Sequence, residues 1–145
     1  MTVDVYVDGS FNEDRNCYGG GYVILVPGCD APIFGKVVGN DKELCKSRNI
    51  SGELLATLQA MQVVSNLTGV TNVNIYHDYT GIAYWVTGTW AAKKPVSRNY
   101  REKMLPYTQK YNISFQHVRG HSGNTYNEMA DKLAREGTFL PLKEL

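Results

Sequence analysis

The stretch that decides the fold is Val3-Asp4-Val5-Tyr6-Val7-Asp8-Gly9-Ser10, near the start of the 145-residue sequence. Its valines alternate with polar or aromatic residues, and this period of two predicts a β-strand. The valines are β-branched and form one apolar side, as a central strand requires. Gly9-Ser10 predicts a turn that ends the strand just after the carboxylate of Asp8. Because a buried charge is costly unless it is paired or bound to a metal, we expect other residues to gather around Asp8.

Length and composition favour one globular domain. The chain is 43% hydrophobic and 20% charged, with a formal net charge of +1, which is ordinary for a soluble domain. No run approaches the ~18 apolar residues of a membrane span, and the early strand pattern argues against a signal peptide. We therefore expect a cytoplasmic protein without a membrane partner. Cys17, Cys29 and Cys45 lack the number and spacing of a disulfide framework or a zinc site.

Hydrophobic periodicity predicts the element order β-β-β-α-β-α-α-β-α. After the first strand, we expect strands at residues 22–26, 31–38, 71–76 and 113–118. Helices are expected from Ser51, at residues 80–86 and 97–111, and after Thr125, with Ser51 as an N-cap and Thr125-x-x-Glu128 as a capping box. Pro106 predicts a break or a kink in the third helix. An antiparallel meander followed by alternating strands and helices predicts an α/β fold with a mixed sheet.

Four acids fall near the ends of predicted elements. Asp8 ends the first strand, Asp78 ends the fourth, Glu53 lies in the first turn of the first long helix, and Asp131 lies early in the last helix. Parallel central strands end at one edge of a sheet, where crossover helices begin. We therefore expect Asp8, Glu53 and Asp78 to meet, with Asp131 joining them if the last helix crosses that edge. Taken singly, each acid also has a structural explanation as a turn, capping or solvated helix residue.

A cluster of carboxylates without cysteine predicts a site for a hard cation, Mg²⁺ or Mn²⁺. Two such ions roughly 4 Å apart catalyse in-line phosphodiester hydrolysis. His121 lies between glycines just before the last helix, a setting suited to proton transfer. Residues 93–110 hold six Lys or Arg residues against one acid, Glu102, which indicates either a polyanion contact or a solvated helix face.

Several motifs occur in one order over residues 1–136. They are Asp8-Gly-Ser10, Gly19-Gly-Gly-Tyr22, Asn49-x-x-Gly-Glu53-Leu-Leu-Ala56, Tyr76-x-Asp78, Val118-Arg-Gly-His121-Ser-Gly123 and Asn127-Glu-x-Ala-Asp131-x-Leu-Ala134. Together they resemble ribonuclease H of type one, and most closely the bacterial branch often linked to a viroplasmin-like module. The resemblance implies a ribonuclease H-like fold, with three antiparallel strands followed by two parallel ones. It also implies a catalytic domain over residues 1–137, with a tail at 138–145 that packs on it.

The resemblance implies endonucleolytic hydrolysis of the RNA strand of RNA–DNA hybrids, leaving 3′-hydroxyl and 5′-phosphate ends. Asp8 would bridge two Mg²⁺ ions, for which Mn²⁺ is the substitute. Asp131 would complete the nucleophile-side ion, and Glu53 and Asp78 the leaving-group-side ion. Glu53 would also accept a hydrogen bond from the RNA 2′-hydroxyl, and His121 would assist proton transfer or product release.

The implied substrate contacts are more numerous than the catalytic residues. Asn49 and the backbone around residues 10–12 would help read the minor groove, and either Trp85 or Trp90 would contact the DNA strand. The full set of substrate-binding predictions is Gly9, Ser10, Asn12, Asn49, Thr80, Trp85, Trp90, Lys93, Lys94, Arg98 and Asn127. Two features depart from the family. Tyr79-Thr80 replaces a polar pair of the Ser-Gln type, and the basic segment after Trp85 is short.

Three functions stay open on this evidence from the sequence. The first is a hybrid-specific ribonuclease. The second is a nuclease of the same fold that cuts double-stranded RNA or branched DNA. The third is a non-catalytic nucleic-acid-binding module, against which the complete set of four acids argues. The sequence leaves the oligomeric state open, with a monomer as the favoured expectation.

Overall fold

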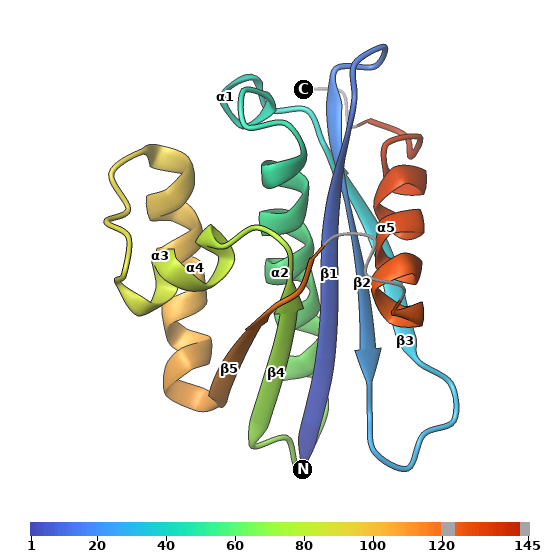
Figure 1. Cartoon of the computed structure of the whole chain (residues 1–145), viewed down its shortest axis with the longest axis vertical. Helices are drawn as coiled ribbons and strands as arrows, with labels where there is room; N and C mark the ends of the chain where they lie inside the picture. Colours follow the sequence, from blue (N-terminus) through green and yellow to red (C-terminus); the bar gives the residue numbers. More distant parts are fainter. Residues whose placement is uncertain (120–123, 143–145) are drawn as a thin grey trace.

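The structure is a computed structural model that describes residues 1–119 and 124–142. Strands and helices alternate along the described chain after an initial run of three strands (Figure 1). The elements are β1 (Thr2–Asn12), β2 (Cys17–Leu25), β3 (Ile33–Gly39), α1 (Lys42–Cys45), α2 (Asn49–Ser65), β4 (Asn72–His77), α3 (Gly81–Thr87), α4 (Pro95–Lys110), β5 (Asn112–His117) and α5 (Thr125–Gly137).

The sheet has five strands in the order β3-β2-β1-β4-β5. β1 and β3 both pair antiparallel with β2, while β1, β4 and β5 run parallel to one another. The predicted mixed sheet, with three antiparallel strands followed by two parallel ones, is therefore confirmed. β1 is the central strand, because it pairs with β2 on one side and with β4 on the other.

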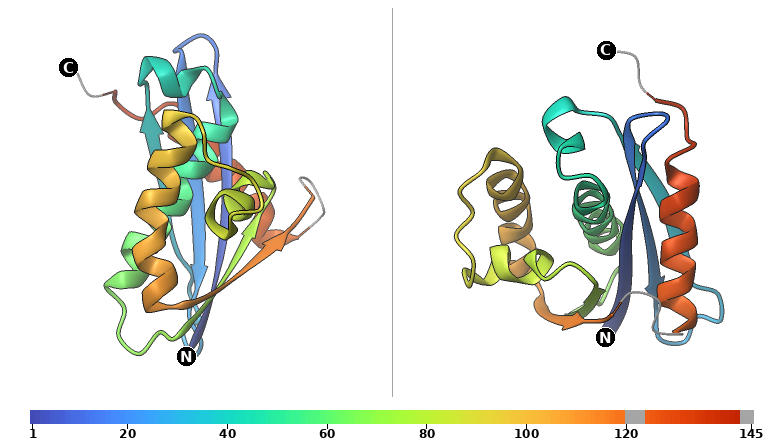
Figure 2. Two further views of the ribbon diagram at one scale, coloured as in Figure 1. Left: turned by 90° about the vertical axis from the view of Figure 1, so that its left-hand side faces the viewer. Right: turned by 45° about the horizontal axis from the view of Figure 1, so that its top comes forward.

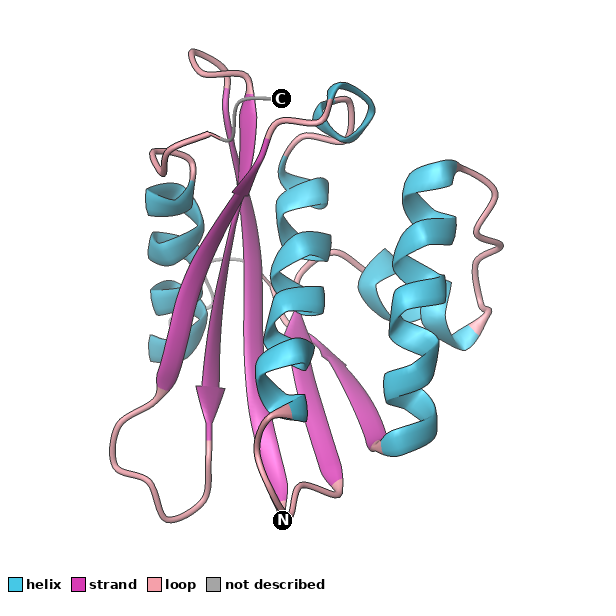
Figure 3. Ribbon diagram, turned by 180° about the vertical axis from the view of Figure 1, so that it is seen from behind, coloured by secondary structure: helices cyan, strands magenta, loops and turns pink. Residues whose placement is uncertain are grey.

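Helices cover the two faces of the sheet unequally (Figures 2 and 3). α2 lies along one face with α3 and α4 beyond it, and α5 lies alone on the opposite face. The alternation in β1 explains this arrangement. Val3, Val5 and Val7 belong to the core under α2, whereas Tyr6 packs on the α5 side with Ala130 and Leu133 of that helix. Both faces of β1 are thus used for packing.

The predicted turn at Gly9-Ser10 is wrong. β1 continues through both residues to Asn12, with Gly9 opposite Gly20 and Ser10 opposite Gly19 in the ladder with β2. The ladder between β1 and β4, however, stops at Tyr6 and Tyr76. Asp8 therefore lies inside a strand that continues past the end of its parallel neighbour, and one of its sides faces the loop after β4.

The predicted start of the first long helix is also wrong. α2 begins at Asn49, so Glu53 lies in its second turn rather than its first. Ser51 is not the N-cap, since its hydroxyl donates a hydrogen bond to the Leu44 carbonyl. The sequence pattern also gave no sign of the short helix α1, which begins after Asp41. The Asp41 side chain accepts hydrogen bonds from two backbone amides of that helix.

Two further helix predictions fail for local reasons. α4 runs through Pro106 without a break, because this proline lies on the exposed side, where water can reach the unpaired carbonyl one turn earlier. α5 is capped by Asn124, whose side-chain oxygen accepts from the amides of Tyr126 and Asn127, and not by Thr125. In the tail, Phe139 is 72% exposed, whereas Thr138 is buried and Arg15 donates hydrogen bonds to the carbonyls of Thr138 and Leu140.

The cysteines agree with the expectation from their spacing. All three are free thiols, with Cys17 and Cys45 buried and Cys29 exposed.

Within residues 1–119 and 124–142, no helix has both the length and the apolar character needed to cross a bilayer.

Candidate active site

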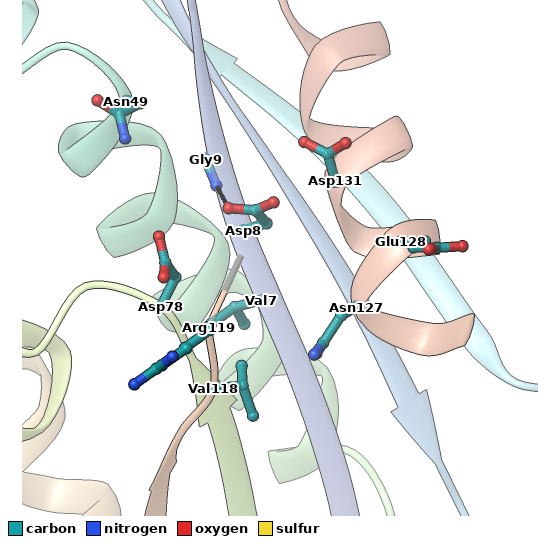
Figure 4. A pocket seen from close by; sticks show the side chains of 10 residues that line it. All are labelled: Val7, Asp8, Gly9, Asn49, Asp78, Val118, Arg119, Asn127, Glu128 and Asp131. Carbon is teal, nitrogen blue, oxygen red and sulfur yellow. Dashed lines mark hydrogen bonds between the residues drawn. The ribbon is translucent and has the colours of Figure 1, made fainter. Parts of the chain in front are cut away.

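Two adjoining hollows at the end of β4 contain the four predicted acids. The α5-side hollow is about 220 Å³ and is lined by Val7, Asp8, Gly9, Asn49, Asp78, Val118, Arg119, Asn127, Glu128 and Asp131. The α2-side hollow is about 290 Å³ and is lined by Asp8, Gly9, Asn49, Ile50, Glu53, Asp78, Tyr79 and Thr80. Asp8 and Asp78 line both hollows. Figure 4 shows Asp8 between Asp78 on one side and Asp131 on the other.

Strand register explains how Asp8 and Asp78 come together. Tyr6 pairs with Tyr76 at the last rung of the parallel ladder, so two residues further along each strand bring Asp8 and Asp78 level with each other. Asp8 shares the α5-facing side of β1 with Tyr6, because side chains alternate along a strand. The backbone N–H of Gly9 donates a hydrogen bond of 2.9 Å to Oδ1 of Asp8, which fixes the carboxylate against its own strand.

Two glycines let the helices approach closely enough to deliver the other acids. A Cβ atom on Gly9 would lie 2.0 Å from the Asn49 carbonyl oxygen and 2.4 Å from the Glu53 nitrogen of α2. On the other face, a Cβ atom on Gly21 would lie 2.3 Å from the Ala130 carbonyl oxygen of α5. Only glycine tolerates such backbone contact. Gly9 therefore lets α2 place Glu53 at the site, and Gly21 lets α5 place Asp131, the residue after Ala130, there.

Glu53 is held by the loop that follows β4. Its side chain is 3% exposed, and its two carboxylate oxygens accept hydrogen bonds from consecutive backbone amides. Oε1 lies 3.0 Å from the Asp78 nitrogen, and Oε2 lies 2.9 Å from the Tyr79 nitrogen. Burial raises the pKa of Glu53 to about 8, against the opposing effect of these two amides, and the nearby charges of Asp8 and Asp78 raise it further.

Asp8 is the second acid whose pKa is strongly raised. Burial raises its pKa to about 7, the Gly9 amide opposes the shift, and the carboxylates of Asp131 and Asp78 add to it. Asp131 in turn forms an ion pair of 3.1 Å with Arg135, one turn further along α5. Asp8 is therefore surrounded by other carboxylates, which is the electrostatic setting in which a cation binds well.

The donor chemistry of this site fits a hard cation, since four carboxylates from four different parts of the fold surround it. The side chains do not, however, already form a ligand cage. Within the described part of the chain, no three His, Cys, Asp or Glu side chains are grouped closely enough to hold a metal ion. Glu53 is turned toward backbone amides and Asp131 toward Arg135. Each Glu53 oxygen keeps a second lone pair for a metal while it accepts its amide hydrogen bond, whereas Asp131 would have to turn inward.

Several predicted substrate residues lie next to the acids. Gly9 and Asn49 line both hollows, Asn127 lines the α5-side hollow, and Thr80 lines the α2-side hollow. His121, the predicted proton-transfer residue, lies outside the described residues. The structure thus brings four of the predicted substrate residues to the acid site.

A second group of predicted residues lies in a separate cavity next to the α2-side hollow. We call it the aromatic groove. It is about 590 Å³ and is lined by Glu43, Lys46, Ser47, Ile50, Tyr79, Trp85, Ala91, Lys93, Lys94, Pro95, Val96 and Ser97. Trp90 packs edge-on against Trp85, with ring centroids 6.2 Å apart, and is 38% exposed. Arg98 donates a hydrogen bond to the Lys93 carbonyl and so supports the loop before α4.

Ser10 and Asn12 do not join the acid site. Both line a different hollow near the C-terminal end of α5, together with Arg15 and Phe139. The Asn12 side chain donates to the Thr138 hydroxyl and accepts from the Arg15 backbone amide. These contacts are structural, and they follow from the continuation of β1 beyond Gly9, which carries both residues away from the acids.

The lining residues that the sequence prediction did not select include Ile50, Tyr79, Arg119 and Lys46. Arg119 lies within the motif before His121, and its charge is an available signal. Tyr79 stands out in the sequence only as a departure from the family pattern, although its position directly after Asp78 places it beside the site. Ile50 and Lys46 carry no sequence signal, because their placement depends on where α1 and α2 begin.

Comparison with known proteins gives one consistent result. A family model described as RNase H matches residues 1–139. Ribonuclease H of Francisella tularensis subsp. novicida is 30% identical over 139 residues, covering 92% of this chain and 89% of that protein. RNase H1 of the archaeon Halobacterium salinarum has the same fold, with a TM-score of 0.75 at 21% identity, covering 94% of this chain and 97% of that one. LC11-RNase H1, solved in complex with an RNA/DNA hybrid, has a TM-score of 0.70 at 19% identity, covering 92% and 94%.

Proposed function

The chain belongs to the ribonuclease H family of nucleases, and we propose that it hydrolyses the RNA strand of RNA–DNA hybrids, leaving 3′-hydroxyl and 5′-phosphate ends. The observation that carries the proposal is the convergence of Asp8, Glu53, Asp78 and Asp131 on two adjoining hollows. A solved structure of the same fold is in complex with an RNA/DNA hybrid, which supports the choice of substrate.

Members of the ribonuclease H family generally use divalent metal ions. We propose two Mg²⁺ ions, with Mn²⁺ as the substitute. Asp8 would be shared between them, Asp131 would hold the nucleophile-side ion, and Glu53 and Asp78 would hold the leaving-group-side ion. When bound, the ions lower the pKa of the attacking water and neutralise charge on the leaving oxygen. Bound cations would also favour the ionised forms of Asp8 and Glu53, against the burial that mainly raises the pKa values of both groups.

Discrimination between RNA and DNA is assigned to the residues around the α2-side hollow. The 2′-hydroxyl is the group that distinguishes an RNA strand from a DNA strand. Glu53 is a buried acceptor in this hollow, and the Asn49 side chain stands beside it at the start of α2. Gly9 lines the same hollow, where its backbone is proposed to meet the RNA strand, while the backbone of α2 fills the space of its missing side chain.

The aromatic groove is assigned to the DNA strand. It adjoins the α2-side hollow through Ile50 and Tyr79, and it combines an indole ring, Trp85, with the ammonium groups of Lys93 and Lys94. An aromatic ring beside cationic side chains suits a single nucleic-acid strand, since the ring stacks on sugars or bases and the cations meet phosphates. The arrangement therefore offers one cavity for each strand of a hybrid.

His121 is proposed to assist proton transfer or product release. The support is the motif Val118-Arg-Gly-His121-Ser-Gly123, together with the position of Val118 and Arg119 in the wall of the α5-side hollow. An imidazole titrates near neutral pH, which suits it to this role.

Cleavage of three labelled duplexes tests the proposal. RNA–DNA hybrid, double-stranded RNA and double-stranded DNA are each incubated with the protein in Mg²⁺, Mn²⁺ or EDTA. We expect cleavage of the RNA strand of the hybrid alone, in either metal and not in EDTA. Preferential cutting of double-stranded RNA would favour the second nuclease function, and binding without cutting in every metal would favour a non-catalytic module.

A further inference from the structure

Tyr79 lies at the junction between the acid site and the aromatic groove. Together with Ile50 it lines both the α2-side hollow and the groove. On the groove side its neighbours include Trp85, and on the other side they include Asp78 and Glu53. A ligand that fills the groove and displaces Tyr79 would therefore also change the wall of the α2-side hollow, beside the acids.

The backbone of Tyr79 is tied to Glu53. Its N–H donates a hydrogen bond of 2.9 Å to Oε2 of Glu53. On the other side of the residue, the Tyr79 carbonyl oxygen lies 2.9 Å from Nδ1 of His77, which is 2% exposed. Since a carbonyl oxygen only accepts, the His77 ring donates this bond from Nδ1. Both peptide groups around Tyr79 are thus hydrogen-bonded, and one of them orients the Glu53 carboxylate.

The ring of Tyr79 packs against two indoles, Trp85 of the groove wall and the neighbouring Trp90. Its centroid lies 5.5 Å from that of Trp85 and 6.0 Å from that of Trp90, at interplanar angles of 60° and 66°. On a further side, a Cβ atom on Gly81 would lie only 2.3 Å from Cε2 of the ring. A ring packed this closely cannot move independently of its neighbours, so a shift of either indole is passed to Tyr79.

We propose that Tyr79 is a positioning residue that couples occupancy of the aromatic groove by a DNA strand to the placement of the Glu53 carboxylate. This inference rests on the proposed function, which supplies the occupant of the groove. A strand stacked on Trp85 and Trp90 holds the Tyr79 ring, and the Tyr79 amide then holds Glu53. An RNA strand that arrives without a DNA partner leaves the groove empty and Glu53 less firmly oriented. Selectivity for hybrids then arises partly in the rate of reaction and not only in binding.

The test measures kcat and KM on one RNA strand paired with DNA strands shortened stepwise from either end. For the wild type, we expect kcat to fall about tenfold once the DNA strand no longer reaches the groove, and KM to rise. Tyr79→Phe keeps the ring contacts and the amide, and it should behave as the wild type does. Tyr79→Ser should have a low kcat that no longer depends on DNA length, whereas its KM should still rise, because Trp85, Lys93 and Lys94 remain.

Two controls make the result specific. Ile50→Ala removes the other side chain shared by both cavities but leaves the Tyr79 amide on Glu53, so its kcat should keep the dependence on DNA length. Tyr79→Leu repeats the test with more apolar bulk, in case thermal unfolding shows that the serine variant is poorly folded. The inference is overturned if both Tyr79→Ser and Tyr79→Leu keep the wild-type response in kcat, or if wild-type kcat is independent of DNA length. A wild-type protein that cleaves no hybrid of any length would instead overturn the proposed function, and this inference with it.

Discussion

At the scale of single residues, the carboxyl groups of Asp8 and Glu53 link the site's chemistry to the stability of the chain. Their pKa values in the folded protein are about 7 and about 8, mainly because both are buried. An acid with a raised folded pKa binds its proton more tightly in the folded than in the unfolded chain. Its contribution is fully favourable below the unfolded pKa of about 4 and is lost as pH rises through the folded pKa.

Asp8→Asn is expected to raise the free energy of unfolding at pH 8 but not at pH 4, when metal is removed with EDTA. The gain should be on the order of 2 kcal/mol, since the variant no longer ionises a buried group. Urea denaturation across this pH range measures it. Asp4→Asn, on the same face of β1, is the matched control and should leave the pH dependence unchanged. An Asp8→Asn curve parallel to the wild type from pH 4 to pH 8 would show that Asp8 ionisation does not limit stability.

His121→Ala tests an auxiliary role at the same scale. If the imidazole only assists proton transfer or product release, removing it should slow turnover of a hybrid on the order of 10²-fold and leave measurable activity. Steady-state cleavage in Mg²⁺ checks this. Complete loss of activity would mean that His121 is essential to the reaction, and an unchanged rate would mean that it has no part in it.

At the scale of elements, the approach of α5 to β2 decides whether Asp131 reaches the site. Gly21→Ala would set a Cβ atom 2.3 Å from the Ala130 carbonyl oxygen and 2.6 Å from the Ala134 nitrogen, so α5 must move outward. We expect destabilisation of about 3 kcal/mol and a loss of cleavage activity larger than the loss of folded protein. Thermal unfolding and the cleavage rate per folded molecule measure the two effects.

Gly28→Ala provides the comparison for this substitution. Gly28 has a φ of +82°, and a Cβ atom on it would meet no atom within 4 Å. Alanine there therefore costs only backbone strain, of about 1 kcal/mol. The Gly28 variant should keep the wild-type cleavage rate. If Gly21→Ala were no more harmful than Gly28→Ala, close approach of α5 would not be what places Asp131.

The order of the longer elements and the positions of the four acids were predictable because they depend on short-range patterns, whereas the short helix α1 was not predicted. The alternation in Val3–Val7 and the position of Asp78 after a β-rich run can be recognised in the sequence without knowledge of tertiary contacts. The extent of β1 did depend on it, since Gly9-Ser10 is a turn signal by itself and stays extended only because Gly19 and Gly20 pair with it. The start of α2 likewise depends on Arg48, a non-glycine residue at a φ of +51° that periodicity does not reveal.

The substrate residues were less predictable than the acids for the same reason. Asn49 and Thr80 lie close to the acids in the chain, and they also lie beside them in the hollows. Ser10 and Asn12 are also close to Asp8 in sequence, but an extended strand carries them away at roughly 3.3 Å per residue. Tyr79 went unselected because its contacts with Trp85 and Trp90 are tertiary contacts that the sequence pattern does not reveal.

At the scale of the whole molecule, the charge distribution predicts salt-sensitive binding. The overall charge is only +1, but the segment from Lys93 to Lys110 is strongly basic. We expect affinity for an RNA–DNA hybrid to fall steeply from low to physiological salt. Replacing Lys93 and Lys94 by alanine should lower the slope of log affinity against log salt by about 1 for each lysine that pairs with a phosphate.

Lys110→Ala is the control for this prediction, because Lys110 belongs to the same basic segment but does not line the groove. Its slope should match that of the wild type, as measured by fluorescence anisotropy at several salt concentrations in Ca²⁺ or EDTA. A wild-type affinity that does not change with salt would show that phosphate contacts do not drive binding.

The carboxylates around Asp8 are proposed to carry out metal-dependent cleavage of the RNA strand in a hybrid. The sharpest test is the single-turnover cleavage rate of a labelled hybrid in saturating Mg²⁺ for the wild type, Asp8→Asn and Asp4→Asn. Asp4 shares the strand face of Asp8 but bonds to Asn74, 3.0 Å away, outside the acid site. We predict a loss of at least about 10³-fold for Asp8→Asn and a rate within about threefold of the wild type for Asp4→Asn. An Asp8→Asn variant that cleaves the hybrid as fast as the wild type would contradict this mechanism.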